Sequence, residues 1–471
     1  MGPALAIAIA TVFGYLALAP AVVNGDGLGY LKAAVSGLPY PGHLLYLPML
    51  RLLRLASGAG QRPIEGLWPA RALSAVGAGV AVLALAAATR RLVKSERAPT
   101  IAAAGLAGSF GMIAAGSDVE TYAPALAGLC VCLWAIACRR TGAGVGSLLV
   151  AALALAVATL FHVENVLFTL PVLLALGRRD GVIVAGAAGA LVLASYLALS
   201  ADASWVLGAS HGFRYPVHWY TPAVAIYGAC KALLFSPYPY EASWARVIGH
   251  FVPGALALGT LGWIALGRDP DRPTRAPLGR AATIGWAVPY ALVGVAFFPS
   301  DSERGVVLLP LFWLTVAATR RRANLALAVA IGLGVLNVIV WLPRARDASW
   351  RDRAGEVARD LRAGDLVVSP GHGWDEYIGV YDGPAVGHFP LVFHVARLGS
   401  AAAVRPVLAE AIRDARRRGH GVFLVRFGAD GDPMGWKELL PFGVTPGNAA
   451  ELLPAGERVG VSGGAERLEA E

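Results

Sequence analysis

The feature that most constrains this chain is a series of apolar runs that recur from its start to about residue 342. The runs are rich in Ala, Leu, Val and Gly, and several reach the ~17–25 residues that an α-helix needs to cross the hydrocarbon layer of a membrane. Across the chain 56% of residues are hydrophobic, 15% are charged, and the mean hydropathy is +0.58. These values exclude an ordinary soluble globular protein. The pattern predicts a polytopic α-helical membrane protein.

The apolar runs predict about eleven transmembrane helices. The two runs around residue 162 are short and are interrupted by His162, Glu164 and Asn165, and the arginines at 178 and 179 favour a hairpin there over one long crossing. The first run has no basic segment before it, so we expect a retained span and not a cleaved signal peptide. The expected spans are 4–23, 67–89, 99–116, 122–138, 145–161, 163–177, 181–200, 248–267, 281–298, 305–319 and 323–342.

The basic residues predict the orientation of these helices. The net charge is +9, and 36 of the 40 basic residues are Arg. Short cytoplasmic loops carry an excess of Lys and Arg. The clusters that close even-numbered spans are Arg90 and Arg91, Arg139 and Arg140, Arg178 and Arg179, the 268–280 loop, and Arg320, Arg321 and Arg322. The N-terminus is therefore expected in the cytoplasm, and the Ala, Gly and Arg bias suggests a bacterial cytoplasmic (inner) membrane. A nucleic-acid partner is not expected, because such proteins concentrate basic residues on one soluble face.

The composition changes at about residue 343, where we place a domain boundary between 1–342 and 343–471. Periodicity predicts helices at 350–362 and 402–418 and strands at 365–369 and 421–427, while residues from 456 onward are expected to be poorly ordered. An odd number of crossings puts this part outside. The sequence therefore predicts a small C-terminal extracytoplasmic α/β domain.

Conspicuous polar residues gather on the outer side in this topology. They are Asp26, Asp118, Glu120, Glu164, Asp301, Glu303 and Arg304. Carboxylates at membrane depth are costly, so they suggest a functional site. The alternative is that loops simply carry polar residues, since the cytoplasmic loops also contain acids interleaved with Arg.

The first two outer loops carry the most suggestive motifs. Asp26 lies among glycines that allow a close approach to a ligand, or it is a turn residue at a helix end. His43 follows at the start of an amphipathic segment. In the second loop, S-D-V-E-T-Y, Asp118 and Glu120 can both reach one hard cation or polar ligand if the chain is extended, or they cap the next helix and favour its dipole.

Three further outer segments offer polar groups. His162, Glu164 and Asn165 interrupt an apolar stretch and are either a ligand site or satisfied structural residues. The turn that contains Glu303 and Arg304 offers a guanidinium suited to phosphate, or it is a salt-bridged turn. Residues 201–247 are rich in Trp, Tyr and Pro, which is typical of a membrane interface; the same rings could stack on a sugar, with Arg214, His211 and His218 near a phosphate.

Two other sets of residues are given structural roles. The loop at 371–377, G-H-G-W-D-E-Y, follows an expected strand and is interpreted as a structural or acceptor-contacting loop, because no nucleophile motif accompanies it. Cys130, Cys132 and Cys138 share one span, where neither a disulfide framework nor tetrahedral zinc is plausible.

These motifs resemble the GT-C superfamily of membrane glycosyltransferases, which includes oligosaccharyltransferase subunits, protein O-mannosyltransferases and lipid A aminoarabinose transferases. In that family an acid in the first outer loop is typically the catalytic carboxylate, and a D-x-D-like or D-x-E pair follows in the second. Asp26 matches the first position, and Asp118 and Glu120 match the second. The stretch P-Y-P-G-H-L-L-Y, which contains His43 and Tyr46, is similar to a permuted form of a mannosyltransferase-like motif.

The resemblance implies an inverting transfer of a sugar, a hexose or pentose, from a polyprenyl-phosphate carrier to a lipid, glycan or protein acceptor at the outer face. Asp26 would be the general base, and Asp118 and Glu120 would hold a divalent cation, Mg²⁺ or Mn²⁺, or polar substrate groups; metal dependence stays open. The expected substrate or phosphate ligands are His43, Tyr46, His162, Glu164, Arg214, Glu303 and Arg304. A flippase or transporter for a lipid-linked or anionic substrate and a non-catalytic membrane assembly partner are the alternatives.

Overall fold

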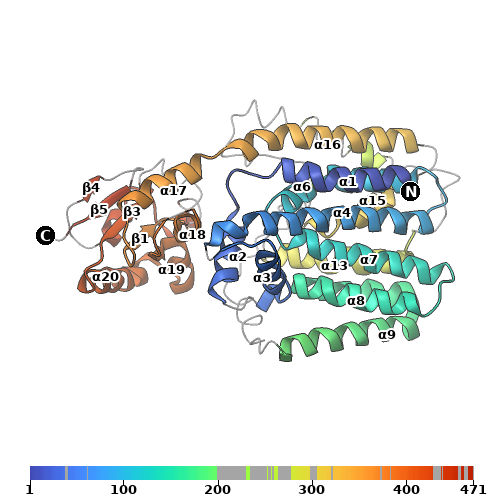
Figure 1. Ribbon diagram of the computed structural model, residues 1–471, viewed down its shortest axis with the longest axis horizontal. Coiled ribbons are helices and arrows are strands. Elements are labelled where there is room, and N and C mark those ends of the chain that lie inside the picture. The colour runs from blue at the N-terminus through green and yellow to red at the C-terminus, as the bar shows by residue number, and fades with distance from the viewer. Residues whose placement is uncertain are drawn as a thin grey trace. The chain divides into compact units, whose positions relative to one another are not determined.

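The structure of the protein is a computed structural model whose described residues form two compact units (Figure 1). The helical unit contains Met1–Pro20, Leu38–Ser57 and Trp68–Arg346, and the α/β unit contains Ala21–Gly37, Gly58–Leu67 and Asp347–Glu471. The described residues are 1–37, 41–60, 62–198, 230–233, 252, 256, 259–263, 277–297, 305–319, 322–371, 374–381, 383–427, 436, 439–453, 458–460 and 465–469.

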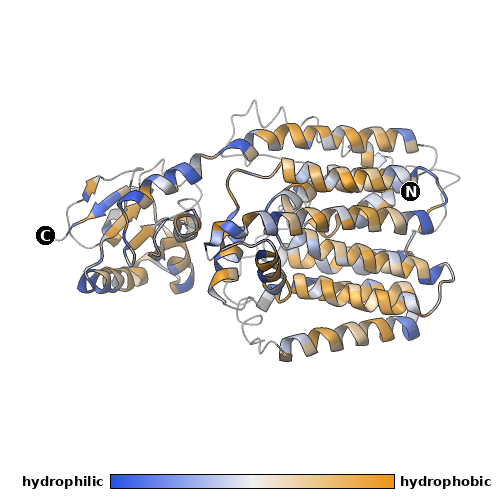
Figure 2. Ribbon diagram, viewed as in Figure 1, coloured by the Kyte–Doolittle hydropathy of each residue, from blue (hydrophilic) through white to orange (hydrophobic). Residues whose placement is uncertain are grey.

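The helical unit is a bundle whose helices are apolar along their length and polar at their ends (Figure 2). Large apolar side chains such as Phe13, Leu149, Leu292 and Val335 are exposed on its surface, as expected where lipid is the solvent. Its α-helices are α1 (Gly2–Ala17), α3 (Tyr46–Ala56), α4 (Leu67–Leu92), α5 (Ala98–Gly108), α6 (Phe110–Ser117), α7 (Tyr122–Arg140), α8 (Gly146–Phe161), α9 (Thr169–Ala198), α13 (Arg280–Phe297), α15 (Leu309–Ala317) and α16 (Ala323–Arg346), with 3-10 turns η1 (Pro41–His43) and η3 (Val163–Phe168).

Apolar helices long enough to cross a membrane are present, which agrees with the expected membrane protein. Among the described residues there are 4 such helices, or up to 5 if α5 and α6 count as one bent span. The expected total of eleven stays a prediction, and the span at 248–267 lies largely outside the described residues. The last span runs beyond its expected end at residue 342, because α16 continues through Pro343 to Arg346.

Helix α9 reverses direction at Gly177. This glycine has φ 77° and ψ 173°, which is not helical. A Cβ added to Gly181 would lie 2.8 Å from the Cα of Leu173. On a straight helix two residues eight apart are roughly 12 Å apart, so the chain must fold back here. This reversal agrees with two separate runs at 163–177 and 181–200.

Arginines from several loops meet at one end of the helical unit, which we call the arginine end. Arg139 at the end of α7 binds Asp180 with a 2.6 Å Nε–Oδ2 distance. Arg140 donates to the carbonyl oxygen of Pro277, and Arg91 donates to the Thr141 hydroxyl. Loops expected on the cytoplasmic side are thus brought together, as the charge pattern requires.

The α/β unit contains a five-stranded mixed sheet of order β2-β1-β3-β5-β4. β1 pairs in parallel with β2 and β3, and β5 is antiparallel to β3 and β4. The strands are β1 (Leu366–Ser369), β2 (Gly387–Pro390), β3 (Val422–Val425), β4 (Arg458–Gly460) and β5 (Ala465–Leu468). The helices are α2 (Gly25–Ser36), α17 (Ser349–Asp360), α18 (Trp374–Val380), α19 (Leu391–Leu398) and α20 (Ala401–Arg417), with 3-10 turns η2 (Pro63–Gly66), η4 (Leu440–Phe442) and η5 (Ala449–Leu452).

Helices cover both faces of this sheet. Val367, Phe423 and Val425 pack with residues of α17 and α18 on one face, and alternate strand residues pack with α19 and α20 on the other. The helices and strands expected between 350 and 427 are present. The expectation of disorder after residue 456 is wrong for β4 and β5, because β5 pairs with the edge of β3 and β4 pairs with β5.

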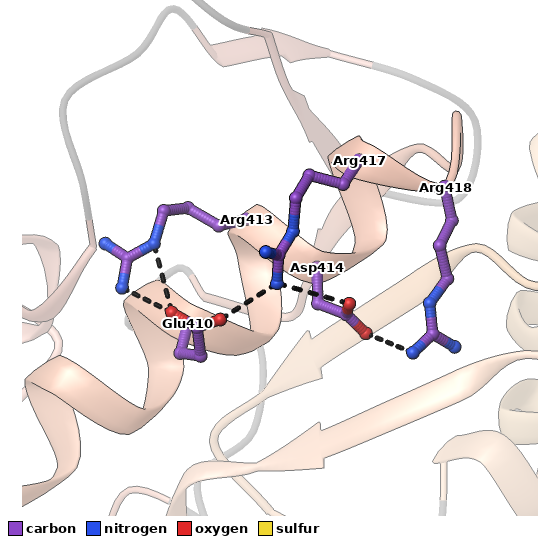
Figure 3. A network of polar contacts seen from close by, with 5 residues as sticks. All are labelled: Glu410, Arg413, Asp414, Arg417 and Arg418. Carbon is purple, nitrogen blue, oxygen red and sulfur yellow. Dashed lines mark hydrogen bonds and ion pairs between the residues drawn. The ribbon is translucent and has the colours of Figure 1, made fainter.

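The outer face of α20 carries a chain of ion pairs (Figure 3). Glu410 binds Arg413 and Arg417, and Asp414 binds Arg417 and Arg418, at spacings that place these side chains on one helix face. The hydrogen bond and charge of Arg413 lower the pKa of the exposed Glu410 carboxyl. These pairs give α20 a solvated face opposite its buried residues Val404 and Leu408.

The expected domains, 1–342 and 343–471, stay a prediction, and the compact units differ from them in one respect. The segments Ala21–Gly37 and Gly58–Leu67 belong to the α/β unit, although the sequence assigned them to an expected outer loop of the membrane domain. The N-terminal segment that contains Asp26 therefore packs with the C-terminal part of the chain.

Candidate functional site

Buried polar residues gather at the other end of the helical unit, which we call the acidic end. It is defined by Asp118, Glu120 and His162, which are 5%, 2% and 7% exposed. α4 has Ser74, the partner of Glu120, in its first part and the arginines in its last turn; α7 starts beside Glu120 and ends in Arg139 and Arg140. α4 and α7 thus run from the acidic end to the arginine end.

The Asp118–Glu120 segment is held by α4. Asp118 follows the last residue of α6 with φ −113° and ψ −174°, so the chain is extended there, as the shared-ligand hypothesis requires. The Ser74 hydroxyl accepts a hydrogen bond from the Glu120 amide (3.1 Å) and donates one to the Glu120 carbonyl (3.0 Å). Asp118 Oδ1 accepts from the Val119 amide, and α7 begins at Tyr122 with no acid in its first turn, so helix capping does not explain these carboxylates.

Tyr46 contributes a buried hydroxyl to the same site. It begins α3, is fully buried, and packs edge-on against Phe161 at 6.4 Å between ring centroids. Burial raises the pKa of the Tyr46 hydroxyl well above its ordinary value, and the Glu120 carboxylate raises it further. The hydroxyl therefore stays protonated near the acids, and its role as a substrate ligand stays a prediction.

Two histidines lie next to each other at the acidic end. The His43 and His162 rings are 4.8 Å apart at 62°, and the Tyr122 ring is 4.6 Å from His162. His43 Nδ1 lies 2.8 Å from the Phe161 carbonyl oxygen, which can only accept, so Nδ1 carries the proton. Glu164 Oε2 is 3.9 Å from His162 Nδ1. The structure thus brings together residues from α3, α7, α8 and the turns beside them.

Asn165 has a structural role that the sequence left open. Its amide nitrogen donates to the Ala158 carbonyl (3.1 Å), and its oxygen accepts from the Tyr290 hydroxyl (3.1 Å). This connects the break after α8 to α8 itself and to α13. Asn165 therefore fixes the turn that presents His162 and Glu164.

A break in the membrane helix positions Asp118 and Glu120. The expected span 99–116 is divided at Ser109, whose φ −71° and ψ 136° are extended, and α5 and α6 meet at 63°. Serine alone does not break a helix. An eight-residue helix is about 12 Å long, so a 63° bend displaces its far end by roughly 12 Å from a straight path. Without the break, Asp118 would lie far from Ser74.

Side chains from three other helices bind the polar groups at this break. The Tyr15 hydroxyl donates to the Ala107 carbonyl (2.6 Å), and Asn337 Nδ2 donates to the Gly108 carbonyl (2.7 Å) and to that of Leu233 (2.9 Å). Trp313 Nε1 donates to the Ser109 hydroxyl (2.9 Å). Backbone groups that a broken membrane helix leaves open must be satisfied within the protein, and here they are.

Glycines allow these partners to reach the break. A Cβ on Gly105 would lie 2.1 Å from the Trp313 ring, and one on Gly108 would lie 2.8 Å from the Cα of Gly334 on α16. Neither position has room for a side chain. The close approach of α5 and α16 then puts Asn337, one turn beyond Gly334, within reach of the Gly108 carbonyl.

Three buried cations in the helical unit were not identified from the sequence, and one of them is Arg54 on α3, which is 5% exposed. Arg71 on α4 is 6% exposed and donates to the Pro20 carbonyl, and Lys231 is 4% exposed in the short described segment 230–233. The signal was present for Arg71, because it lies inside the apolar run at 67–89, where a charge is expensive.

Asp26 lies in the other unit. It is exposed in the first turn of α2, where Asn24 is the N-cap and its Oδ1 accepts from the Gly27 amide (2.6 Å). It is therefore not merely a turn residue at the end of the first helix, and an acid here is favoured by the helix dipole. Three expected ligands, Arg214, Glu303 and Arg304, lie outside the described residues.

Solved structures have a similar fold, although no protein-family model matches the chain and no curated protein matches it in sequence. The crystal structure of ArnT from Cupriavidus metallidurans bound to undecaprenyl phosphate is similar with a TM-score of 0.57 at 13% identity, over 99% of this chain and 97% of that one. Its apo state gives a TM-score of 0.59 at 13% identity, over 99% and 96%. An Archaeoglobus fulgidus oligosaccharyltransferase, solved with Zn and sulfate, gives 0.45 at 12% identity, over 82% and 62%. The two ArnT structures thus share the fold of this chain.

Proposed function

We propose that this protein is an inverting glycosyltransferase that moves a sugar from a polyprenyl-phosphate carrier to an acceptor at the outer face of a bacterial cytoplasmic membrane. The observation that carries the proposal is the buried Asp118–Glu120 pair at the acidic end of a GT-C fold. Carboxylates at membrane depth are costly and by default indicate a functional site. The ArnT structure with undecaprenyl phosphate supports a carrier of that chemical class.

In the proposed reaction an acceptor hydroxyl attacks the anomeric carbon of the sugar. The bond from that carbon to the carrier phosphate oxygen breaks, so the carrier leaves as polyprenyl phosphate and the configuration inverts. Asp26 takes the proton of the attacking hydroxyl as general base. Arg304 and Arg214 neutralise the departing phosphate, and Glu303 contacts the substrate.

The acidic end fits a divalent cation, Mg²⁺ or Mn²⁺. Two buried hydroxyls, of Ser117 and Thr121, have no hydrogen-bond partner among the described residues and flank Asp118 and Glu120. No group of three His, Cys, Asp or Glu residues suited to a metal occurs in the described part of the chain. Mg²⁺ is commonly held by one or two carboxylates with water and substrate phosphate, so the pair is sufficient. A bound cation would supply charge that stabilises phosphate oxygens.

Other expected ligands lie in contact with one another at the acidic end. His43, His162 and Glu164 can donate to or accept from sugar hydroxyls, and the Tyr122 ring next to His162 adds an apolar face on which a sugar can pack. Tyr46 supplies a protonated hydroxyl that can donate to the substrate. The charge pattern supports an extracytoplasmic α/β unit and a cytoplasmic N-terminus.

The test is sugar transfer by the purified full-length chain in lipid nanodiscs. Release of polyprenyl phosphate from a labelled polyprenyl-phosphate sugar is measured for wild type, Asp26→Asn and Glu96→Gln, an exposed acid near the arginine end that serves as control. Wild type and Glu96→Gln should transfer, and Asp26→Asn should lose at least a hundredfold in rate. A wild type that transfers from no such donor refutes the proposal, and an active Asp26→Asn removes Asp26 from the base role. Reporter fusions after Arg140 and Arg346 should be cytoplasmic and external.

One observation favours a second candidate, a flippase or transporter for a lipid-linked substrate. The broken α5–α6 span resembles the discontinuous helices that bind substrates in transporters. Translocation of a fluorescent polyprenyl-phosphate lipid in proteoliposomes, without sugar transfer, would favour this function.

A further inference from the structure

The C-terminal part of the chain binds both backbone polar groups of Val23, which lies just before α2. The Val23 amide donates to the Tyr381 hydroxyl (3.0 Å), and the Val23 carbonyl accepts from the Tyr377 hydroxyl (3.3 Å). Both polar groups of a single fully buried residue are thus satisfied by two tyrosines. These contacts join segments that are more than 350 positions apart in the sequence.

The two tyrosines form a rigid pair. They are four residues apart, and the Tyr381 amide donates to the Tyr377 carbonyl (3.1 Å), so the last turn of α18 continues through Tyr381. Their rings lie nearly parallel, with 6.5 Å between centroids and 15° between planes. The Arg351 guanidinium of α17 lies 5.6 Å from the Tyr381 ring centroid. We call Tyr377 and Tyr381 the tyrosine clamp.

The clamp acts on the start of α2. Val23 immediately precedes Asn24, the N-cap of α2, and Asp26 lies in the first turn. On the buried side of α2, Leu28 and Leu31 are fully enclosed, while Asp26 is exposed. The clamp and these leucines therefore hold the turn while its carboxylate stays accessible.

The sequence of the first turn of α2 is too rich in glycine to fix the turn without contacts from other segments. It reads G-D-G-L-G from residue 25, and each glycine in a helix costs about 1 kcal/mol relative to alanine. Glycine also leaves the backbone free to sample many conformations. A carboxylate on such a segment would be poorly positioned by local structure alone.

We propose that Tyr377 and Tyr381 are positioning residues for Asp26, and that holding the base-bearing turn is a function of the C-terminal domain. The part that concerns catalysis rests on the proposed function. Precise placement of a reacting group supplies much of the rate of a two-substrate reaction, and a shift of about 1 Å can cost about a hundredfold.

The test compares wild type with Tyr377→Phe, Tyr381→Phe and the double variant, all full-length in nanodiscs. Phenylalanine keeps the rings and removes only the hydroxyls. The matched control is Ser400→Ala, because it also removes a side-chain bond to a backbone amide, that of Ala403, on the opposite face of the same sheet.

Two readouts are needed. Hydrogen exchange of residues 22–30 should be at least tenfold faster in the double variant and unchanged in Ser400→Ala. The kcat of transfer should fall at least tenfold, with KM for the donor within about twofold, because the donor site itself is untouched. A merely structural role would lower kcat and the amount of folded protein together.

The outcomes separate the two proposals. Unchanged exchange in the double variant refutes the clamp, and changed exchange with unchanged kcat refutes its role in catalysis. A wild type that transfers no sugar refutes the proposed function, and the exchange measurement then decides alone whether the clamp holds the turn.

Discussion

Replacing Asn337 with leucine should weaken the bend between α5 and α6 that positions Asp118 and Glu120. Leucine has nearly the same volume but no donors, so the 2.7 Å bond to Gly108 and the 2.9 Å bond to Leu233 are both lost. Such bonds in membrane proteins average about 0.6 kcal/mol and reach about 1.7, so the two together are worth about 1–3 kcal/mol. Since 1.4 kcal/mol is a factor of ten, we expect kcat to fall roughly 5- to 150-fold if this energy holds α6 in its bent orientation.

The assay is donor turnover together with hydrogen exchange of residues 117–122. The Glu120 amide is bound to Ser74 in the bent state, so its exchange should accelerate in Asn337→Leu. Thr89→Val is the control: it also removes a buried side-chain bond, to the Leu85 carbonyl, near the arginine end of α4. Equal losses in the two variants, or unchanged exchange at 117–122, would show that Asn337 only stabilises the bundle.

Three further results are expected. Glu120→Gln should fold normally yet lose at least a hundredfold in transfer rate, since it removes a charge from the acidic end; an activity near that of wild type would exclude the cation role. Gly105→Ala should lower the thermal midpoint by the equivalent of about 1–3 kcal/mol, because its Cβ meets an indole ring, and an unchanged midpoint would contradict that packing. Burial, followed by the charges of Arg397 and His388, lowers the pKa of His394. The folded state therefore favours the neutral ring, so the free energy of unfolding is highest above about pH 6.5 and decreases as the pH falls through the lowered pKa. An NMR titration of His394 with a midpoint at or above 6.5 would refute this prediction.

Sequence patterns predicted well what depends on local chemistry. Apolar runs located the helices, and arginine clusters identified loops that do meet, as Arg139 and Asp180 show. The polar interruptions at His43 and His162 were assigned to one site, and their rings are in contact. In each case the cost of a polar group in an apolar setting was visible in the sequence itself.

What depends on distant partners was not predictable. Ser109 carries no signal for a 63° bend, because the bend is made by Trp313 and Asn337, more than two hundred positions away. The expected domain boundary likewise treated the first outer loop as part of the membrane domain. The two hydroxyls that bind Val23 give no periodicity or motif that could have revealed the contact.

The α/β unit is built from segments that are far apart in the sequence, and this has a consequence for biosynthesis. Its first segment ends at Gly37, and its main part begins at Asp347, so about 300 residues are made between them. At a synthesis rate of roughly 5–20 residues per second, about 15–60 s pass between the synthesis of the first outer loop and that of the residues it packs against. Throughout that interval Leu28 and Leu31, fully buried in the finished protein, have no core to enter. We expect the nascent loop to be the segment most open to proteases and most in need of a chaperone during membrane insertion.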